Sequence, residues 1–370
     1  MTRTLAFTAR EIFWPPADEL TVAAERIRAR LGDWPSAVAP WRICLTPPDA
    51  PRAGDLVIVA GGLLDDRFER AKYSASGVVL IEAQANSVCL TMDGKRHVLA
   101  GPLAEDWLAA LAGFLDCGFD ACDALVLALA WRDGDETDAR RDDAWPVDLS
   151  RFPRIDGLPA APAEPYPHCP DRLGLYAVMP SAQWVERVLG LGVATVQLRV
   201  KGGTPGALAA EIAASVAAGR RHGARVFIND HWREAIDAGA YGVHLGQEDL
   251  DTADLGAIAA AGLRLGLSTH GYFEMLRALH FRPSYLAFGA VFATATKTVA
   301  TAPQGLARLS RYVRLLNGAV PLVAIGGIDL SRLPAVLDTG VGSAAVVSAI
   351  TGAGDAAAAV KGLEQTFTDR

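Results

Sequence analysis

The sequence predicts an α/β protein in two parts, a smaller α/β domain followed by a (β/α)8 (TIM) barrel. Three observations predict this fold. The C-terminal half contains eight apolar runs of strand length, and alanine-rich amphipathic stretches separate them. Strands that alternate with helices pair in parallel through right-handed crossovers. The proline-dense segment RFPRIDGLPAAPAEPYPHCPDR divides this half from the residues before it.

The eight runs are nearly continuous in apolar residues, which is typical of strands that are covered on both faces. They span residues 174–180, 194–200, 225–230, 241–247, 264–269, 284–292, 320–327 and 343–350. Eight βα units in roughly 200 residues lie at the lower edge of the size of a (β/α)8 barrel. A doubly wound open sheet is the competing fold. The number of runs, and the polar clusters that follow them, favour the barrel.

Prolines interrupt helices and sheets, so residues 153–172 are expected to form a linker. Residues 1–152 then form an N-terminal α/β accessory domain, and residues 173–370 form the barrel. In the first domain, LVIVAGG and VVLIEAQ are expected to be strands, and SVCLTMDGKRHVLAG a hairpin that turns at Asp93-Gly94. Residues 103–132 should form two helices around Gly118. Six of the eight tryptophans precede residue 150, which predicts a genuine core there.

Composition excludes several classes of function. A hydrophobic fraction of 51% and a charged fraction of 21% suit a globular protein with a sizeable core. The net charge of −7 argues against a broad nucleic-acid-binding surface. No apolar run is long enough to span a membrane, and the N-terminus has no apolar core of a signal peptide. The five cysteines show no metal-binding spacing, which predicts reduced thiols and a cytoplasmic location.

An amide and two cations follow the second run of the barrel half, in the pattern Gln197-x-Arg199-x-Lys201. Strand residues two apart share a face, so these side chains are expected to point the same way. They would form an anion clamp, because Arg can hold a phosphate through two parallel hydrogen bonds. The plainer alternative is three solvated residues on a strand edge. That alternative is weak for a buried strand, because inward charges need partners.

Carboxylates follow the third and fourth runs, in Asn229-Asp230 and in Gln247-Glu248-Asp249. Oxygen ligands on adjacent strands suit Mg²⁺, which takes one or two carboxylates together with phosphate oxygens. Each acid alone could instead be a helix N-cap or a loop residue, but the neighbouring clamp favours the metal. We therefore predict Asp230 and Asp249 as metal ligands, with Glu248 as a rival to Asp249. His244, within the fourth run, is more simply a hydrogen-bonded core histidine.

The remaining strand ends carry hydroxyls and glycines. Ser268-Thr269-His270 follow the fifth run, and residues 294–297, which include Lys297, follow the sixth. Gly326-Gly327 and Val347-Ser348 follow the last two runs, in the places of the usual barrel phosphate site. Gly326-Gly327 alone could be a tight turn. Together the strand ends predict one clamp with metal and a second anion site, which suits two anionic substrates or one substrate with two phosphates.

Six segments, in order, resemble the motif series of thiamine-phosphate synthases: QLRVK, NDHWREAIDAGAYGVHLGQED, GLSTH, FATATK, VAIGGI and VVSAI. The resemblance implies a (β/α)8 barrel and a transferase activity with Mg²⁺ as cofactor. The implied substrates are small molecules, 4-amino-2-methyl-5-(diphosphooxymethyl)pyrimidine and 4-methyl-5-(2-phosphoethyl)thiazole or its carboxylate form. The products would be thiamine monophosphate and pyrophosphate. No nucleic-acid or membrane partner is implied, and a homo-oligomer is compatible with this family.

The resemblance also implies a role for each matching residue. The pyrimidine diphosphate would contact Gln197, Leu198, Arg199, Val200, Lys201, Asn229, Ser268 and Lys297. The thiazole phosphate would contact Thr294, Ala295, Thr296, Gly327, Val347 and Ser348. Mg²⁺ would bind Asp230 and Asp249. The groups that act in the reaction itself would be Arg199, Lys201, Ser268 and Lys297.

The implied reaction is dissociative. Pyrophosphate leaves first, the ring amine stabilises the resulting pyrimidine methylene cation, and the thiazole nitrogen then attacks it. This matches a sequence with no evident pair of nucleophile and base. One segment departs from the family pattern, because GLYAVMP stands where an ending similar to LYLVTD is usual. The contribution of the first barrel strand is therefore left open.

The first domain lies outside this resemblance. Its helical end, GPLAEDWLAALAGFLDCGFDACDALVLALA, is similar to the closing helices of hydroxymethylpyrimidine phosphate kinases of the ribokinase-like fold. The glycines that would cradle a phosphate are missing around residues 102–105, and the domain is too short for a whole kinase. It is expected to be a degenerate remnant with a structural or assembly role.

Two other functions compete with the synthase. A thiazole tautomerase of the same barrel family would transfer protons without a metal, and would not need the complete clamp and both aspartates. A non-catalytic scaffold, in which both halves are remnants, would not be expected to keep a ligand set at every informative strand end.

Overall fold

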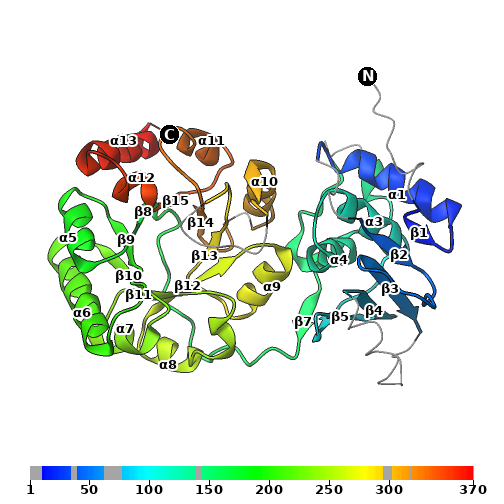
Figure 1. Cartoon of the computed structure of the whole chain (residues 1–370), viewed down its shortest axis with the longest axis horizontal. Coiled ribbons are helices and arrows are strands. Elements are labelled where there is room, and N and C mark those ends of the chain that lie inside the picture. Colours follow the sequence, from blue (N-terminus) through cyan, green and yellow to red (C-terminus); the bar gives the residue numbers. More distant parts are fainter. Residues whose placement is uncertain are drawn as a thin grey trace. The chain divides into compact units, whose positions relative to one another are not determined.

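The computed structural model describes residues 11–34, 40–61, 77–138, 143–294, 302–316 and 318–369. The chain divides into two compact units, Met1–Pro159 and Ala160–Arg370. Figure 1 shows an α/β sheet unit and a closed barrel. The limits of the predicted linker, 153–172, remain a prediction.

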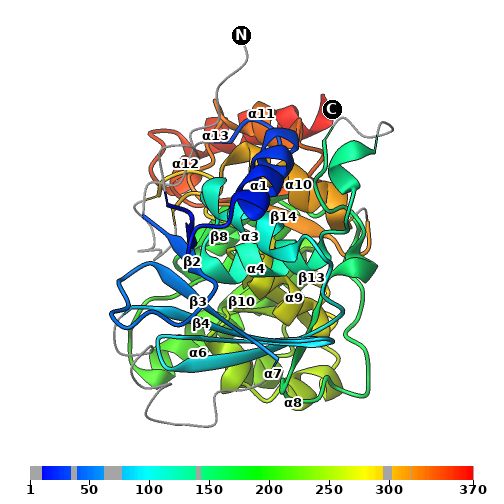
Figure 2. The same cartoon turned by 90° about the vertical axis from the view of Figure 1, so that its right-hand side faces the viewer.

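The first unit contains a seven-stranded sheet whose strands follow one another in chain order. Its strands are β1 (Phe13–Trp14), β2 (Arg42–Cys44), β3 (Asp55–Ala60), β4 (Val79–Gln84), β5 (Ser87–Met92), β6 (Lys95–Ala100) and β7 (Arg154–Asp156). Strands β1 to β4 pair in parallel, and β4 to β7 pair antiparallel. The described helices are α1 (Asp18–Arg30), α3 (Trp107–Asp116) and α4 (Ala121–Ala130). Figure 2 shows the same elements turned by 90°.

The expected turns of this unit are confirmed. Asp93 and Gly94 join β5 to β6 with φ values of 50° and 72°, as a type I′ hairpin turn requires. Gly118, with φ 76°, lies between α3 and α4, so the expected helix pair is also present.

The tryptophan-rich core is also confirmed. Trp34, Phe114, Phe119, Trp131 and Trp145 pack as one aromatic cluster with ring centroids 5.0–6.5 Å apart. Trp131 and Trp145 are fully buried. Aromatic side chains bury large apolar areas, so this cluster stabilises the unit.

A buried ion pair joins β2 to β3. Arg42 donates from Nε to Oδ1 of Asp55 at 3.0 Å and from Nη2 to Oδ2 at 2.8 Å. Burial alone would raise the pKa of Asp55, but hydrogen bonds from Arg42 and the Arg52 backbone outweigh it and lower the pKa. The pair satisfies two charges that the interior could not otherwise hold.

The second unit is a closed barrel of eight parallel strands, as predicted. The strands are β8 (Gly174–Met179), β9 (Thr195–Leu198), β10 (Arg225–Asn229), β11 (Gly242–Leu245), β12 (Arg264–Thr269), β13 (Tyr285–Phe288), β14 (Leu322–Ile325) and β15 (Ser343–Val346). Because β15 pairs with β8, the sheet has no edge, and the doubly wound alternative is excluded. Figure 1 shows the outer helices around the strands.

These outer helices follow each strand in turn. They are α5 (Ala182–Gly190), α6 (Pro205–His222), α7 (Trp232–Ala238), α8 (Leu255–Ala260), α9 (Tyr272–His280), α10 (Gly305–Leu316), α11 (Leu333–Leu337), α12 (Ser348–Thr351) and α13 (Ala356–Thr368). Helix α6 shows how the sequence sets its limits. The Thr204 side chain caps its first turn, Pro205 opens it, and Gly223 ends it with φ 63°.

Glycines make room for aromatic rings inside the barrel. A Cβ built on Gly242 would lie 2.6 Å from the Phe227 ring, and one on Gly266 would lie 2.1 Å from the Tyr285 ring. Phe227 and Tyr285 are fully buried and belong to the barrel's interior cluster together with Tyr176. Alternating small and large residues therefore fill the barrel, so its interior is packed rather than open.

Residues before β8 pack against the barrel. The Tyr166 hydroxyl donates to the Leu255 carbonyl at 3.0 Å, and Arg264 Nε donates to the His168 carbonyl at 2.9 Å. Cys169 is buried within the interior cluster. Burial raises the pKa of the Cys169 thiol to about 11, which keeps the thiol neutral and unreactive at neutral pH.

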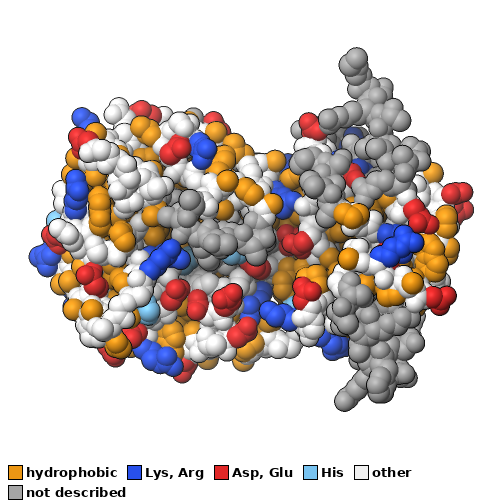
Figure 3. Space-filling model, viewed as in Figure 1, with side chains coloured by type: hydrophobic (Ala, Val, Ile, Leu, Met, Phe, Trp, Pro, Cys, Tyr) orange, Lys and Arg blue, Asp and Glu red, His pale blue; other side chains and the backbone are white. Residues whose placement is uncertain are grey.

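None of the helices in the described ranges is both long and apolar enough to cross a membrane. Figure 3 shows acidic and basic side chains interspersed over the face in view. All five cysteines are free thiols.

Candidate active site

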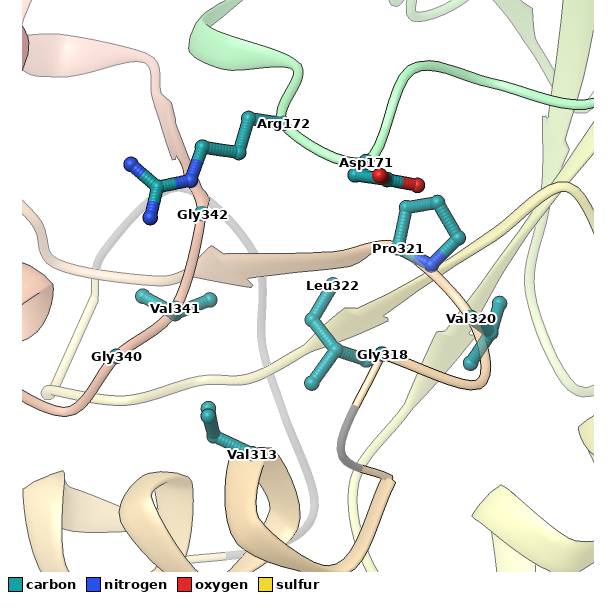
Figure 4. A pocket seen from close by; sticks show the side chains of 10 residues that line it. All are labelled: Asp171, Arg172, Val313, Gly318, Val320, Pro321, Leu322, Gly340, Val341 and Gly342. Atoms are coloured by element: carbon teal, nitrogen blue, oxygen red, sulfur yellow. The ribbon is translucent and has the colours of Figure 1, made fainter.

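The predicted site residues that the structure describes lie at the carboxyl ends of the barrel strands or in the segments that follow them. Barrel enzymes bind their substrates at this end. Two cavities lie at the opposite end. One, of about 140 Å³, is lined by residues next to the starts of β8, β14 and β15, and Figure 4 shows Val313, Leu322 and Val341 around it. The other, of about 320 Å³, includes Arg220 and Arg264. Neither cavity contains a predicted site residue.

The end of β9 carries the predicted clamp. Gln197, the penultimate residue of the strand, is 4% exposed and donates from Nε2 to the Tyr176 hydroxyl at 3.2 Å. Leu198 ends the strand and is buried. The Arg199 N–H still donates to the Met179 carbonyl at 2.8 Å, so Arg199 continues the strand pairing. Lys201 is exposed and lies beyond the strand, so side-chain alternation does not place it on the face of Gln197.

Asn229 ends β10 and is buried, and Asp230 follows it. Asp230 is exposed and has a φ of 64°, in the left-handed region that few residues other than glycine adopt. Its N–H donates to the His244 carbonyl at 3.0 Å, which ties this turn to the next strand. Backbone strain of this kind gathers at functional sites, where the surrounding structure holds it in place.

Asp249 lies in the loop that follows β11, at the start of a short 3-10 helix, Asp249–Asp251. Its Oδ2 accepts the Gly246 N–H at 2.7 Å, which folds the carboxylate back over its own loop. Glu248 is exposed and precedes this short helix. The loop is thus shaped by the carboxylate that was predicted as a metal ligand.

The loops after β11 and β12 are tied together. Gln247 Nε2 donates to the Ser268 carbonyl at 2.8 Å, and Arg277 of α9 donates to the Gln247 carbonyl at 2.8 Å. Arg277 also forms an ion pair with Asp251. These contacts fix the segment that carries Asp249 against the end of β12.

The two predicted metal ligands are of the chemical type that Mg²⁺ prefers. Asp230 and Asp249 follow neighbouring strands, β10 and β11, which pair in parallel. Both supply carboxylate oxygens, the ligand type that Mg²⁺ prefers, and one or two carboxylates suffice when substrate phosphates complete the shell. Within the described ranges no group of three or more His, Cys, Asp or Glu residues is arranged to hold a metal.

A buried chain of hydrogen bonds links five strands inside the barrel. It starts at Gln197 on β9 and passes to Tyr176, whose hydroxyl oxygen lies 2.7 Å from that of Tyr285. The Tyr285 oxygen lies 2.7 Å from His244 Nδ1, and His244 Nε2 lies 2.8 Å from Ser268 Oγ. The His244 ring also stacks on Tyr285, with centroids 5.6 Å apart and an interplanar angle of 26°. The prediction that His244 is a hydrogen-bonded core histidine is confirmed.

Sequence reasoning missed the two tyrosines in this chain. Tyr176 and Tyr285 lie within apolar runs and resemble ordinary core residues. A signal was present, because a tyrosine hydroxyl in a buried strand needs a hydrogen-bond partner. Burial raises the pKa of both hydroxyls above the ordinary value, so both remain protonated donors at neutral pH.

Two backbone hydrogen bonds join the start of the segment after β13 to the residues around the start of α10. The Gln304 N–H donates to the Ala290 carbonyl at 2.7 Å, and the Gly305 N–H donates to the Val291 carbonyl at 2.9 Å. Thr294 is partly exposed in this loop. Ala295, Thr296 and Lys297 lie outside the described residues, so their predicted roles stay predictions.

The ends of β14 and β15 carry the predicted phosphate site. Gly326 and Gly327 have φ values of 103° and 64°, and a Cβ on Gly327 would lie 2.6 Å from the Ala293 carbonyl oxygen. Only glycine fits there. Val347 precedes the short helix α12, and Ser348 is its exposed first residue. The Phe292 N–H donates to the Gly326 carbonyl at 3.0 Å, so the end of β14 lies beside the loop after β13.

Comparison with known proteins gives consistent matches. The family model for thiamine monophosphate synthase matches residues 175–350. A thiamine-phosphate synthase of Escherichia coli O157:H7 is 58% identical over 190 residues, 51% of this chain and 90% of the relative. One of Cronobacter sakazakii is 60% identical over 191 residues, 52% of this chain and 89% of the relative. A solved structure, a thiamine phosphate pyrophosphorylase from Pyrococcus furiosus, is 29% identical with a TM-score of 0.48, covering 54% of this chain and 97% of that chain.

Proposed function

This chain belongs to the thiamine-phosphate synthase family, and on that basis we propose how its barrel joins a pyrimidine diphosphate to a thiazole phosphate. The substrates are 4-amino-2-methyl-5-(diphosphooxymethyl)pyrimidine and 4-methyl-5-(2-phosphoethyl)thiazole or its carboxylate. The products are thiamine monophosphate and pyrophosphate. The observation that carries the proposal is the identity of 58–60% to two named synthases across nearly their whole length.

The reaction exchanges one bond for another. The bond between the pyrimidine methylene carbon and the diphosphate oxygen breaks, and pyrophosphate leaves with the electron pair. The ring amine stabilises the methylene cation that remains. The lone pair of the thiazole nitrogen then forms the new carbon–nitrogen bond. No protein nucleophile is needed, so the residues of the site have to bind, orient and neutralise charge.

Cations that follow β9 and β13 in the sequence act on the leaving group. Arg199 and Lys201 neutralise the negative charge that grows on the diphosphate, and Lys297 acts on it from the loop after β13. Ser268 donates a hydrogen bond to the same substrate. Gln197, Leu198, Val200 and Asn229 line the pyrimidine site. Groups fixed on strand ends stabilise developing charge without having to reorganise during the reaction.

Asp230 and Asp249 would hold Mg²⁺. When bound, this ion neutralises diphosphate charge and stabilises the departing pyrophosphate. The places of Asp230 and Asp249, in the segments that follow the neighbouring parallel strands β10 and β11, support this assignment. Glu248 is the alternative to Asp249.

The thiazole phosphate takes the second anion site. Its phosphate contacts Gly327 and the backbone of Val347 and Ser348, and residues 294–296 are predicted to contact it as well. Glycines at this place let backbone N–H groups approach a phosphate closely.

We further propose that the first unit is an accessory domain, a remnant of a ribokinase-like kinase. Its parallel strands, followed by an antiparallel hairpin and the helix pair α3 and α4, support this kinship. The matched family model begins only at residue 175. The five free cysteines support a reducing, cytoplasmic location.

Incubation with each substrate alone and with both tests the proposal against the tautomerase. The synthase forms thiamine monophosphate only when both substrates and Mg²⁺ are present. A tautomerase would exchange a proton of the thiazole carboxylate for deuterium from heavy water without any pyrimidine. Deuterium exchange without coupling would replace the synthase by the tautomerase, and neither reaction from folded protein would favour the scaffold.

A further inference from the structure

The hydrogen-bonded chain inside the barrel is buried along its middle. Tyr176, Tyr285 and His244 are 1%, 0% and 5% exposed. Water does not reach these groups freely, so each hydroxyl proton and the imidazole proton must be shared along the chain. The three contacts between them and Ser268 have lengths of 2.7–2.8 Å, within the range of good hydrogen bonds.

Both ends of this hydrogen-bonded chain lie where the substrate is expected to bind. Gln197 is the penultimate residue of β9, and Ser268 is the penultimate residue of β12. Both are therefore at the carboxyl end of the barrel, and both are in the proposed pyrimidine site. The chain runs from one of these residues into the barrel and back to the other.

The donor at one end sets the direction of every bond. Gln197 donates from Nε2 to Tyr176. Either tyrosine could donate in the next contact, and each tyrosine proton has an acceptor within the chain when the Tyr176 hydroxyl donates to Tyr285. The Tyr285 hydroxyl must then donate to Nδ1 of His244, which accepts only in the neutral ring with its proton on Nε2. Nε2–H donates to Ser268 Oγ.

This direction fixes what each end offers to a ligand. Gln197 gives one Nε2 proton to Tyr176, and its Oε1 is the acceptor that remains for a ligand. Ser268 receives a hydrogen bond from His244, so its own hydroxyl proton is available to donate. The reverse direction would make Gln197 a donor and Ser268 an acceptor. The donor and acceptor roles of Gln197 and Ser268 therefore change together.

We propose that this chain couples the hydrogen-bonding roles of Gln197 and Ser268, and so selects an aminopyrimidine in one orientation. The inference rests on the proposed function. The exocyclic amine is the one group of the pyrimidine diphosphate that donates hydrogen bonds, so it is placed at Gln197. An acceptor, either a ring nitrogen or a diphosphate oxygen, is placed at Ser268. Tyr176, Tyr285 and His244 are positioning residues that act through these two.

The first test reads the proton on His244 in the unaltered full-length protein. Nitrogen-15 NMR of histidine-labelled protein distinguishes a protonated ring nitrogen from an unprotonated one, and His244→Gln assigns the signal. We expect a neutral ring with Nε2 protonated and Nδ1 unprotonated. A proton on Nδ1, or on both nitrogens, at neutral pH would overturn the stated direction of the chain.

The second test breaks the chain. Tyr285→Phe removes the oxygen that joins Tyr176 to His244, so the Gln197 amide is free to turn over. The probes are the 4-amino pyrimidine monophosphate and its 4-methoxy counterpart, which have no diphosphate to lose and differ in the donor at position 4. The unaltered protein should bind the amino compound roughly tenfold or more tightly, because a mismatched buried group loses its hydrogen bond.

In Tyr285→Phe this preference should fall below about threefold, while the methoxy compound binds at least as well as before. Tyr312→Phe is the matched control, since Tyr312 is a fully buried tyrosine on α10 outside the chain, and it should keep the full preference. If Tyr285→Phe weakens the binding of both compounds equally, the tyrosine has only a structural role and the inference is overturned. An unaltered protein that does not prefer the amino compound would also overturn it.

Both tests are independent of turnover. A protein that makes thiamine phosphate but shows the wrong histidine tautomer would contradict the coupling alone. A protein with the expected tautomer and binding preference but without coupling activity would contradict the proposed function alone.

Discussion

Gly266 on β12 leaves the space that the Tyr285 ring of β13 occupies: a Cβ on Gly266 would lie 2.1 Å from that ring. No real side chain tolerates such a distance, so the two positions form one unit of packing. The pair explains how a large tyrosine can stand in the barrel interior with its hydroxyl between Tyr176 and His244.

Gly266→Ala should therefore be costly. We expect a loss of about 1–3 kcal/mol in the free energy of unfolding, because an added methyl group overpacks the core. Coupling activity should also fall as the Tyr285 hydroxyl leaves its partners. Urea unfolding and a thiamine-phosphate assay measure the two effects. Gly206→Ala is the control, because nothing lies within 4 Å of a Cβ there, and it should be neutral or slightly stabilising. Equal stability of the two variants would contradict the packing argument.

Two variants of Asp230 test the role of its carboxylate charge separately from the role of its backbone conformation. Asp230→Asn keeps a residue that tolerates φ 64° while removing the carboxylate charge. It should unfold like the unaltered protein and lose coupling activity by roughly 100-fold, the order of effect of one electrostatic group at a reacting centre. Asp230→Ala should lose the same activity and, in addition, about 1–2 kcal/mol of stability. Undiminished Mg²⁺-dependent turnover in Asp230→Asn would remove this residue from the metal site.

Alkaline pH should unfold the barrel through its buried tyrosines. Burial raises the pKa of Tyr176 and Tyr285 above the ordinary value of 10.0, so folding favours the protonated hydroxyls. The stabilisation is complete below pH 10 and is lost as the pH rises further, because the unfolded chain releases these protons first. Tyrosinate absorbance from these residues should appear together with the loss of circular dichroism. Full tyrosine ionisation near pH 10 with the fold intact would refute this prediction.

The first unit offers a test of its accessory role. Arg42→Leu leaves the Asp55 carboxylate, 2% exposed, without its main partner, which costs about 3–5 kcal/mol. Tryptophan fluorescence should report the lower stability, while the coupling rate stays unchanged if the unit is accessory. The double variant Arg42→Leu/Asp55→Leu should recover most of the loss. A coupling rate that falls with the stability of this unit would show that the unit supports catalysis.

A truncated chain addresses the same question from the barrel side. A chain that begins at Ala160 keeps Tyr166 and Cys169, which pack on the barrel, and should fold with full activity. A chain that begins at Gly174 loses both contacts and should unfold at lower urea concentration. Equal stability of the two chains would show that these residues contribute nothing.

The sequence predicted the barrel well because its strands are apolar on both faces and short helices separate them. All eight runs contain a strand, and the run at 264–269 matches β12 at both ends. The other seven runs extend past the strand that they contain, and the runs at 284–292 and 343–350 extend furthest. The chain turns after Phe288, and Ser348–Thr351 is a helix, because apolar residues continue past the last strand pairing. Periodicity alone does not show where pairing stops.

Other features depend on contacts that no local pattern shows. Strands β1, β2 and β7 have two or three residues each, and β7 falls at Arg154–Asp156 inside the proline-dense segment. Such short strands exist only because a neighbour pairs with them. The clamp was expected to share one face, but β9 ends at Leu198, before Lys201. The tyrosines of the buried chain were hidden because their partners come from other strands.

The coupling reaction itself tests directly whether the barrel is a thiamine-phosphate synthase. Full-length protein is incubated with the pyrimidine diphosphate, the thiazole phosphate and Mg²⁺, and both products are quantified by phosphorus NMR. We expect equimolar thiamine monophosphate and pyrophosphate, and neither product when one substrate is omitted. Folded protein that forms no thiamine monophosphate would contradict it.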